Sequence, residues 1–245
     1  MSKNIHGRVS TPDPKQNHIL ASLPAKDYAR LLPELVLVEM PLQWTMSESG
    51  DHVNFLHFPI AGIVSLIYTL EDGSSSETAL VGNEGLVGIS IFMGGESMPS
   101  STEVQSAGQA YRLSRKVMKR EFALGGQLQH IALLFTQAMI CQTSQMAVCN
   151  QHHSLEQQVC RWLLMTMDRL NSNEIVITQE MIGKLLGVRR ESVTQIAGLL
   201  QKNGIITRHR GRINVVDRPQ LEERSCECYA VVKAEYARLL PFRQK

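Results

Sequence analysis

The chain has 245 residues, of which 43% are hydrophobic and 20% are charged, and its formal net charge is +2. These proportions are typical of a soluble globular protein with a hydrophobic core, and they exclude a disordered chain and a collagen-like fibre. The length predicts one large domain or two smaller ones, and the absence of an apolar secretion signal among the first residues predicts a cytoplasmic protein.

The first half of the chain has the pattern of a polar segment followed by short strands. Residues 1–20 are polar and contain two prolines, which predicts a mobile N-terminal segment. Further along, short β-type runs alternate with turn residues, and Asp72-Gly73 between two of them predicts a hairpin. Strands at this spacing predict a small antiparallel roll over residues 21–125. The β-type runs are 35–40, 53–58, 63–70, 77–81, 103–106 and 110–113.

A long uncharged helix is predicted next. Residues 122–155 contain no Asp, Glu, Lys or Arg, but their longest apolar run is five residues, whereas a membrane-spanning helix needs about twenty, so we expect no membrane contact. Apolar residues at steps of three and four predict that residues 126–153 form a helix that pairs with its copy in a homodimer. The alternative is that this face packs on the roll of the same chain. The predicted seam consists of Leu128, Ile131, Phe135, Met139, Gln142, Met146 and Cys149.

Two short helices joined by a glycine turn are predicted after residue 177. Thr178 is expected to cap the first helix, Gly187 to form the turn, and the second helix to run from about Arg190 to Lys202. This arrangement is a helix-turn-helix. The β-type runs that follow, around a basic turn at residues 209–211, predict a wing, so that residues 154–218 form a winged-helix domain.

Charge is distributed unevenly between these regions. Residues 184–218 carry eight Lys or Arg against two acids, whereas residues 1–183 carry twelve against seventeen. A compact basic segment beside an acidic body indicates that the segment binds a polyanion.

The pattern of the C-terminal tail, residues 219–245, predicts an extra helix with an apolar stripe, packed on the winged helix or on the roll.

The five cysteines, an odd number, all lie in the second half of the chain and predict reduced thiols rather than disulfides. Cys149 with His152 and His153, and the pair Cys226 and Cys228, match no standard ligand spacing. We therefore expect no metal and no other cofactor.

The segment Thr178–Thr194 resembles the CRP/FNR family of bacterial transcription factors, and Arg190–Val193 is similar to the start of that family's recognition helix. Residues Pro59–Gly62 and Gly85–Gly88 resemble the glycine-marked turns of its β-roll. The resemblance covers nearly the whole chain and implies an α+β fold: an antiparallel β-roll of the cyclic-nucleotide-binding type, a long dimerisation helix and a winged helix-turn-helix. It implies a homodimeric, non-enzymatic regulator that binds double-stranded DNA at a palindromic operator, with RNA polymerase as a further partner.

The resemblance also assigns DNA-contacting residues. Arg190 and Glu191 are expected at base edges, Arg190 on guanine and Glu191 on cytosine, and Gln195 is expected in the same groove. Arg189 stands where relatives cap the second helix with Ser or Thr, so we expect a poorly capped helix and a phosphate contact from Arg189. The other candidates for DNA contacts are Thr178, Lys184, Ser192, Thr194, Arg208, Arg210 and Arg212.

The sensor half departs from the family's cyclic-nucleotide pattern. Binders follow the second glycine turn with Glu and later place Arg and Ser or Thr at the phosphate, but here Ile89 follows Gly88 and no Lys or Arg occurs in residues 31–111. A buried phosphate needs a cationic partner or a nest of backbone amides, so we expect no cyclic AMP binding in the usual mode. The effector is left open, with Gly85, Gly88, Ser100 and Ser101 as pocket candidates.

Two other classes of function remain open on the sequence. A cupin-like metalloenzyme could use His52 and His57 with Glu48 or Glu71, although the His-x-His pair typical of cupins is absent. A protein-binding adaptor could use the winged helix without touching DNA, but the basic charge of residues 184–218 argues against it.

Overall fold

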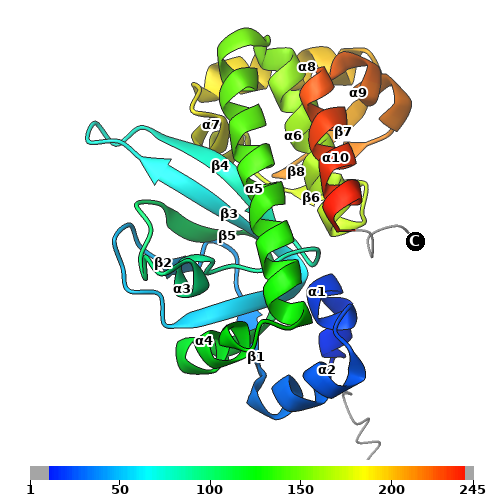
Figure 1. Cartoon of the computed structure of the whole chain (residues 1–245). Coiled ribbons are helices and arrows are strands. Elements are labelled where there is room, and N and C mark those ends of the chain that lie inside the picture. The colour runs from blue at the N-terminus through cyan, green and yellow to red at the C-terminus, as the bar shows by residue number, and fades with distance from the viewer. Residues whose placement is uncertain (1–10, 241–245) are drawn as a thin grey trace, which may run out of the picture.

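The computed structural model describes residues 11–240 and has the expected α+β architecture. An antiparallel roll, a long helix and a group of C-terminal helices follow one another along the chain (Figure 1). In the roll the strand order is β1-β5-β3-β4, and β2 pairs with β5. The strands are β1 (Val36–Met40), β2 (Thr45–Ser47), β3 (Phe55–Thr69), β4 (Ser75–Val81) and β5 (Ser101–Ser114).

Four of the predicted strands merge into two long ones. The runs 53–58 and 63–70 lie in β3, and the runs 103–106 and 110–113 lie in β5. The predicted turn at Ala61-Gly62 lies inside β3, where the register with β5 shifts on both sides of Ala61. Gly62 has a φ of 82°, and a Cβ there would approach the Ser106 carbonyl oxygen to 2.4 Å. The glycine therefore marks a bulge that bends a long strand rather than a turn that ends one. The hairpin at Asp72-Gly73 is confirmed, since β3 and β4 pair on either side of it.

The N-terminal region is more ordered than predicted. The expectation of mobility is wrong for residues 14–20, which form a 3-10 turn (η1, Pro14–Gln16) and helix α1 (His18–Ala21), whereas residues 1–10 lie outside the described residues. Ile19 and Leu20 are fully buried. Asn17 caps α1 and donates hydrogen bonds to the carbonyl oxygens of Pro59 and Gly85. Helices α2 (Ala25–Leu31), α3 (Ser90–Met93) and α4 (Arg115–Ala123) and the 3-10 turn η2 (Leu32–Glu34) complete this half.

Helix α5 (Gln127–His152) is the long uncharged helix, but its predicted dimer seam is wrong. Every residue of that seam is buried inside the chain: Leu128, Ile131, Phe135, Met139, Gln142, Met146 and Cys149. The face packs against the roll, as in the alternative interpretation, and against the C-terminal helix. By length and composition alone α5 could cross a membrane, and 44% of its most apolar window is buried inside the described structure.

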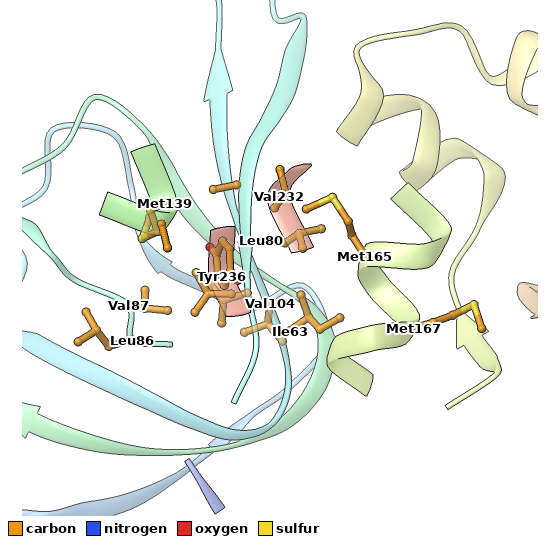
Figure 2. Close-up of a cluster of buried hydrophobic side chains, with 14 of the residues drawn as sticks. Ile63, Leu80, Leu86, Val87, Val104, Met139, Met165, Met167, Val232 and Tyr236 are labelled. Atoms are coloured by element: carbon orange, nitrogen blue, oxygen red, sulfur yellow. The ribbon is translucent and has the colours of Figure 1, made fainter. Parts of the chain in front are cut away.

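The C-terminal tail is two helices, α9 (Arg218–Arg224) and α10 (Glu227–Leu239). Helix α10 runs antiparallel along α5 (Figure 1), whereas the sequence pattern predicts a tail packed on the winged helix or the roll. Figure 2 shows Tyr236 and Val232 of α10 among buried side chains of the roll and of helices α5 and α6 (Leu155–Leu170). The tail therefore contributes to the same hydrophobic core as the roll.

Buried polar side chains connect the roll to α6. Arg169 of α6 lies 2.6 Å from Glu84 and donates a hydrogen bond to Gln142 of α5. Glu77 of β4 accepts hydrogen bonds from Trp162 of α6 and from Ser65 of β3. Such pairing is needed because an unpaired buried polar group costs stability.

Candidate nucleic-acid interface and sensor pocket

The predicted helix-turn-helix is present with the expected limits. Helix α7 (Gln179–Leu186) begins at Thr178, whose side chain accepts a hydrogen bond from the Met181 amide. Gly187 ends it with a φ of 68°, a conformation that favours glycine. A Cβ at Gly183 would lie 2.8 Å from the Val188 carbonyl oxygen, so the close turn requires glycine there as well.

The second helix, α8 (Arg190–Lys202), exposes one face. Arg189 is its N-cap and makes no capping hydrogen bond, as the arginine at this position predicted. Val193, Ala197 and Leu200 are buried against the rest of the domain. Arg190, Glu191 and Gln195 are exposed, so the side chains assigned to base reading point away from the core.

A three-stranded sheet forms the wing beside α8. Strands β6 (Glu174–Val176), β7 (Ile206–His209) and β8 (Arg212–Val215) are ordered β6-β8-β7. The tight turn between β7 and β8 has Arg210 and Gly211 at positive φ, as a two-residue hairpin of the primed type requires.

A groove runs between the wing and the start of α7 and α8. Of the predicted contact residues, it brings together Thr178, Arg190, Arg208, Arg210 and Arg212. Gln179, Gln201 and His209 also line it and were missed, although their positions in the first turn of α7, near the end of α8 and at the wing tip could have indicated them. The other candidates, Lys184, Arg189, Glu191, Ser192, Thr194 and Gln195, lie outside the groove lining.

The basic side chains differ in whether they already have partners. Among the described residues, Arg189, Arg190 and Arg210 form no hydrogen bond or ion pair with another side chain through their guanidinium groups. Arg208 instead donates to Gln201, and Arg212 pairs with Glu174 at 2.5 Å. The three unpartnered guanidinium groups are available to an external anion without breaking an internal contact.

Two predicted contacts are engaged inside the protein. Lys184 forms a 2.7 Å ion pair with Glu103 of β5, so its ammonium group faces the roll and not the groove. The Thr194 hydroxyl lies 2.7 Å from the Gln179 side-chain oxygen, to which it donates. In this conformation both residues hold α7 in place.

The roll contains a second cavity, between β2, β3, the segment 86–90 and β5. Gly88 and Ser100 line it as predicted. Gly85 does not, because it packs against the Phe135 ring, and the Ser101 hydroxyl donates to the Ile67 carbonyl oxygen outside the cavity. The remaining lining is largely apolar, with Met46, Val53, Phe55, Leu86 and Met139 among the contributors.

The cavity offers no cation to the phosphate of a cyclic nucleotide. No Lys or Arg lines it, and Glu48 contributes a carboxylate that would repel an anion. Arg112 is the Lys or Arg closest in sequence to the lining residues. Its guanidinium lies 4.4 Å from the centre of the Phe55 ring and is not part of the lining. The buried hydroxyls of Ser90 and Ser100 have no hydrogen-bond partner among the described residues, and they would suit a neutral polar group.

The histidines of the cupin alternative do not come together as metal ligands. His57 lies in β3, where burial and the nearby Arg112 lower its pKa to about 4. His52 is exposed and accepts a hydrogen bond from Arg115. In residues 11–240, neither histidine belongs to a cluster of three or more potential metal ligands.

Comparisons with known proteins match one family model to the roll and another to the helix-turn-helix region. Residues 45–123 match the family model of the cyclic nucleotide-binding domain, and residues 157–224 match that of the Crp-like helix-turn-helix domain. The comparison with curated proteins finds no match.

Several solved structures share the fold. A CRP-family transcriptional regulator from Thermus thermophilus is 18% identical with a TM-score of 0.66, over 77% of this chain and 96% of that one. The c-di-GMP-responsive global regulator CLP from Xanthomonas campestris is 16% identical with a TM-score of 0.64, over 78% and 99%. FixK2 from Bradyrhizobium japonicum is 15% identical with a TM-score of 0.65, over 78% and 98%. With both family models matched in the same order as the fold, the chain belongs to the CRP/FNR family of transcription regulators.

Proposed function

We propose that the protein is a cytoplasmic, sequence-specific DNA-binding regulator that acts as a homodimer on a palindromic operator. The observation that carries this proposal is the position of Arg190, which is exposed in the first turn of the second helix of a helix-turn-helix and has no internal partner. Arginine there can bind guanine O6 and N7 in the major groove. Arg210 at the wing tip and Arg189 supply phosphate contacts beside it.

The exposed face of α5 supports the dimer. Leu133, Ile140 and Val148 are 46%, 61% and 48% exposed, and they are spaced seven and eight residues apart on a helix without charged residues. A heptad-like apolar stripe of this kind is what a helix presents to its copy in a coiled-coil pair. The dimer seam is thus proposed on the side of α5 opposite to the one predicted from the sequence.

Changing Ile140 to aspartate is expected to convert the dimer to a monomer, because two carboxylates would be buried against each other at the seam. Sedimentation equilibrium or light scattering should then give half the mass of the parent protein. Val231→Asp is the control, since Val231 is also an exposed apolar residue, 41% accessible, but lies on α10. A dimer that survives Ile140→Asp would place the seam elsewhere.

The DNA-binding proposal is tested by selecting bound sequences from a random DNA pool with the purified full-length chain. We expect recovery of a palindrome whose half-sites are about ten base pairs apart, one turn of DNA. Affinity for that sequence should fall steeply with salt, because lysine and arginine contacts release counterions from the phosphates. If the protein enriches no sequence alone or with a panel of nucleotides, the proposal fails.

We further propose that cyclic AMP is not the effector. The cavity of the roll offers no cation to a phosphate and carries Glu48, so neutral and largely apolar ligands suit it better. Calorimetric titration with cyclic AMP, cyclic GMP and cyclic di-GMP is expected to show no binding at the cavity. Binding of cyclic AMP that is lost in Ser100→Val but kept in Ser101→Val would contradict this proposal.

A further inference from the structure

Three buried cysteines and one histidine meet where α5 ends and α10 begins. Cys149 lies in the last turn of α5 and His153 is its C-cap, while Cys226 is the N-cap of α10 and Cys228 lies in its first turn. The cysteines are at most 3% exposed, and the side chain of His153 is 15% exposed. The four residues are far apart in the sequence, with Cys149 and Cys226 separated by 77 positions.

The donor atoms of these residues have the spacing of a tetrahedral metal site. All four lie within 4.8 Å of one another. The Sγ atoms of Cys149 and Cys226 are 3.4 Å apart, as are Sγ of Cys228 and Nδ1 of His153. In a zinc site with Zn–S bonds of about 2.3 Å, two sulfur ligands are about 3.8 Å apart, so small side-chain movements would complete the coordination.

Neighbouring polar residues orient two of the four ligands. Nε2 of His153 lies 3.2 Å from a carboxylate oxygen of Glu227, which leaves Nδ1 facing Cys228. A carboxylate on the second ring nitrogen is the usual partner of a zinc-bound histidine, because it fixes the ring and its tautomer. The Gln145 amide donates to Sγ of Cys228 at 3.2 Å.

A buried positive charge lies next to the cluster. Arg161 is 1% exposed, and its Nε and Nη2 atoms have no hydrogen-bond partner among the described residues. Its charge interacts with both Cys149 and Cys226. Zinc with three thiolates and a neutral histidine carries a net charge of −1, which this guanidinium would balance.

We infer that Cys149, His153, Cys226 and Cys228 form a structural zinc site. Binding exchanges the thiol protons for Zn²⁺, with no change of oxidation state, and the closed set of four ligands leaves no position for a substrate. The metal holds the first turn of α10 against the junction of α5 and α6. This junction lies on the path of the chain from the roll to the helix-turn-helix. Carboxylate-rich calcium or magnesium sites have a different donor set.

The experiment uses the full-length chain, purified under reducing conditions without added metal. Elemental analysis is expected to find one zinc per chain, and exchange with Co²⁺ should give the thiolate charge-transfer band and the d–d bands of tetrahedral cobalt. The variants Cys228→Ser and His153→Asn should lose most of the metal. Cys160→Ser and His152→Asn are matched controls, because each replaces the same residue type outside the cluster, and both should keep it.

Glu227→Gln tests the site without disturbing a buried residue, since its side chain is 72% exposed. Loss of the carboxylate that orients His153 should weaken zinc affinity about 10- to 100-fold, as measured by competition with a chromophoric chelator. The inference is overturned if the reduced parent chain binds neither zinc nor cobalt, or if the ligand variants bind as well as the controls. An iron–sulfur chromophore, or a disulfide between Cys149 and Cys226 in the reduced preparation, would also overturn it.

Discussion

Replacing Arg190 with alanine is expected to reduce affinity for the selected operator by a factor between about 30 and 20,000. One lost bidentate contact with guanine costs about 1–3 kcal/mol, and a symmetric dimer loses two, about 2–6 kcal/mol. The fold should be unaffected, because Arg190 is exposed and has no internal partner. Fluorescence anisotropy on the selected operator and on a scrambled duplex measures the change in specific and in non-specific affinity.

Arg210→Ala separates base reading from phosphate binding in the same assay. Arg210 lies at the wing tip, so its loss should weaken binding to both duplexes alike and lower the salt slope by about one per contact. Arg238→Ala is the control, because Arg238 is exposed on α10 and pairs with Glu235. If Arg190→Ala left the ratio of operator to scrambled affinity unchanged, α8 would not read the operator through Arg190.

The helix-turn-helix could be predicted from sequence because local signals determine it. A capping threonine, a glycine at positive φ and a basic second helix all fall within residues 178–202, and the structure has the helix limits that they predicted. The same argument explains the hairpin at Asp72-Gly73. Gly62 was predicted to end a strand at a turn, but it lies in a bulge within β3. Both structures place glycine at positive φ, and only the pairing with the neighbouring strand distinguishes them.

The seam on α5 could not be predicted in the same way. A periodic apolar stripe shows that a helix face is buried, but it does not say which surface covers it. Gln142 illustrates this, since it resembled a polar residue in a coiled-coil seam but instead donates to the Leu80 carbonyl oxygen and accepts from Arg169. The tail helix that covers the same face begins 75 residues after α5 ends, beyond the reach of local patterns.

Contacts between distant segments also explain why some site residues were assigned wrongly or missed from the sequence. Lys184 was predicted to contact DNA because it is a cation on the first helix. In the structure it pairs with Glu103, which lies 81 positions earlier in the sequence. The cysteine cluster was missed for the same reason, because each half of the ligand set alone has no standard spacing. Only the antiparallel packing of α5 and α10 brings the two halves together.

Glu77→Gln is expected to make stability less dependent on pH and to stabilise the protein at pH 8. Burial, opposed by the hydrogen bond from Ser65 and by the charge of Arg161, raises the pKa of Glu77 from 4.5 to about 7. The Ser65 hydroxyl has one proton but two acceptors, Glu77 at 2.5 Å and Gln105 at 2.9 Å. Ionised Glu77 accepts from Ser65. Once protonated, Glu77 can donate to Ser65 instead, which leaves the Ser65 proton for Gln105, and a glutamine amide can donate in the same way.

The sign of the pH effect follows from where the proton is bound. Between pH 4.5 and about 7 the folded chain keeps the Glu77 proton and the unfolded chain loses it, so the free energy of unfolding falls as the pH rises, by on the order of 3 kcal/mol in total. Urea unfolding at pH 5 should therefore give similar stability for parent and Glu77→Gln, and at pH 8 the variant should be more stable. Glu71→Gln, at an exposed position in the β3–β4 turn, should match the parent at both pH values. A Glu77→Gln variant that is less stable than the parent at pH 8 would mean that Glu77 is ionised and stabilised by Arg161 and Arg169 in the folded protein.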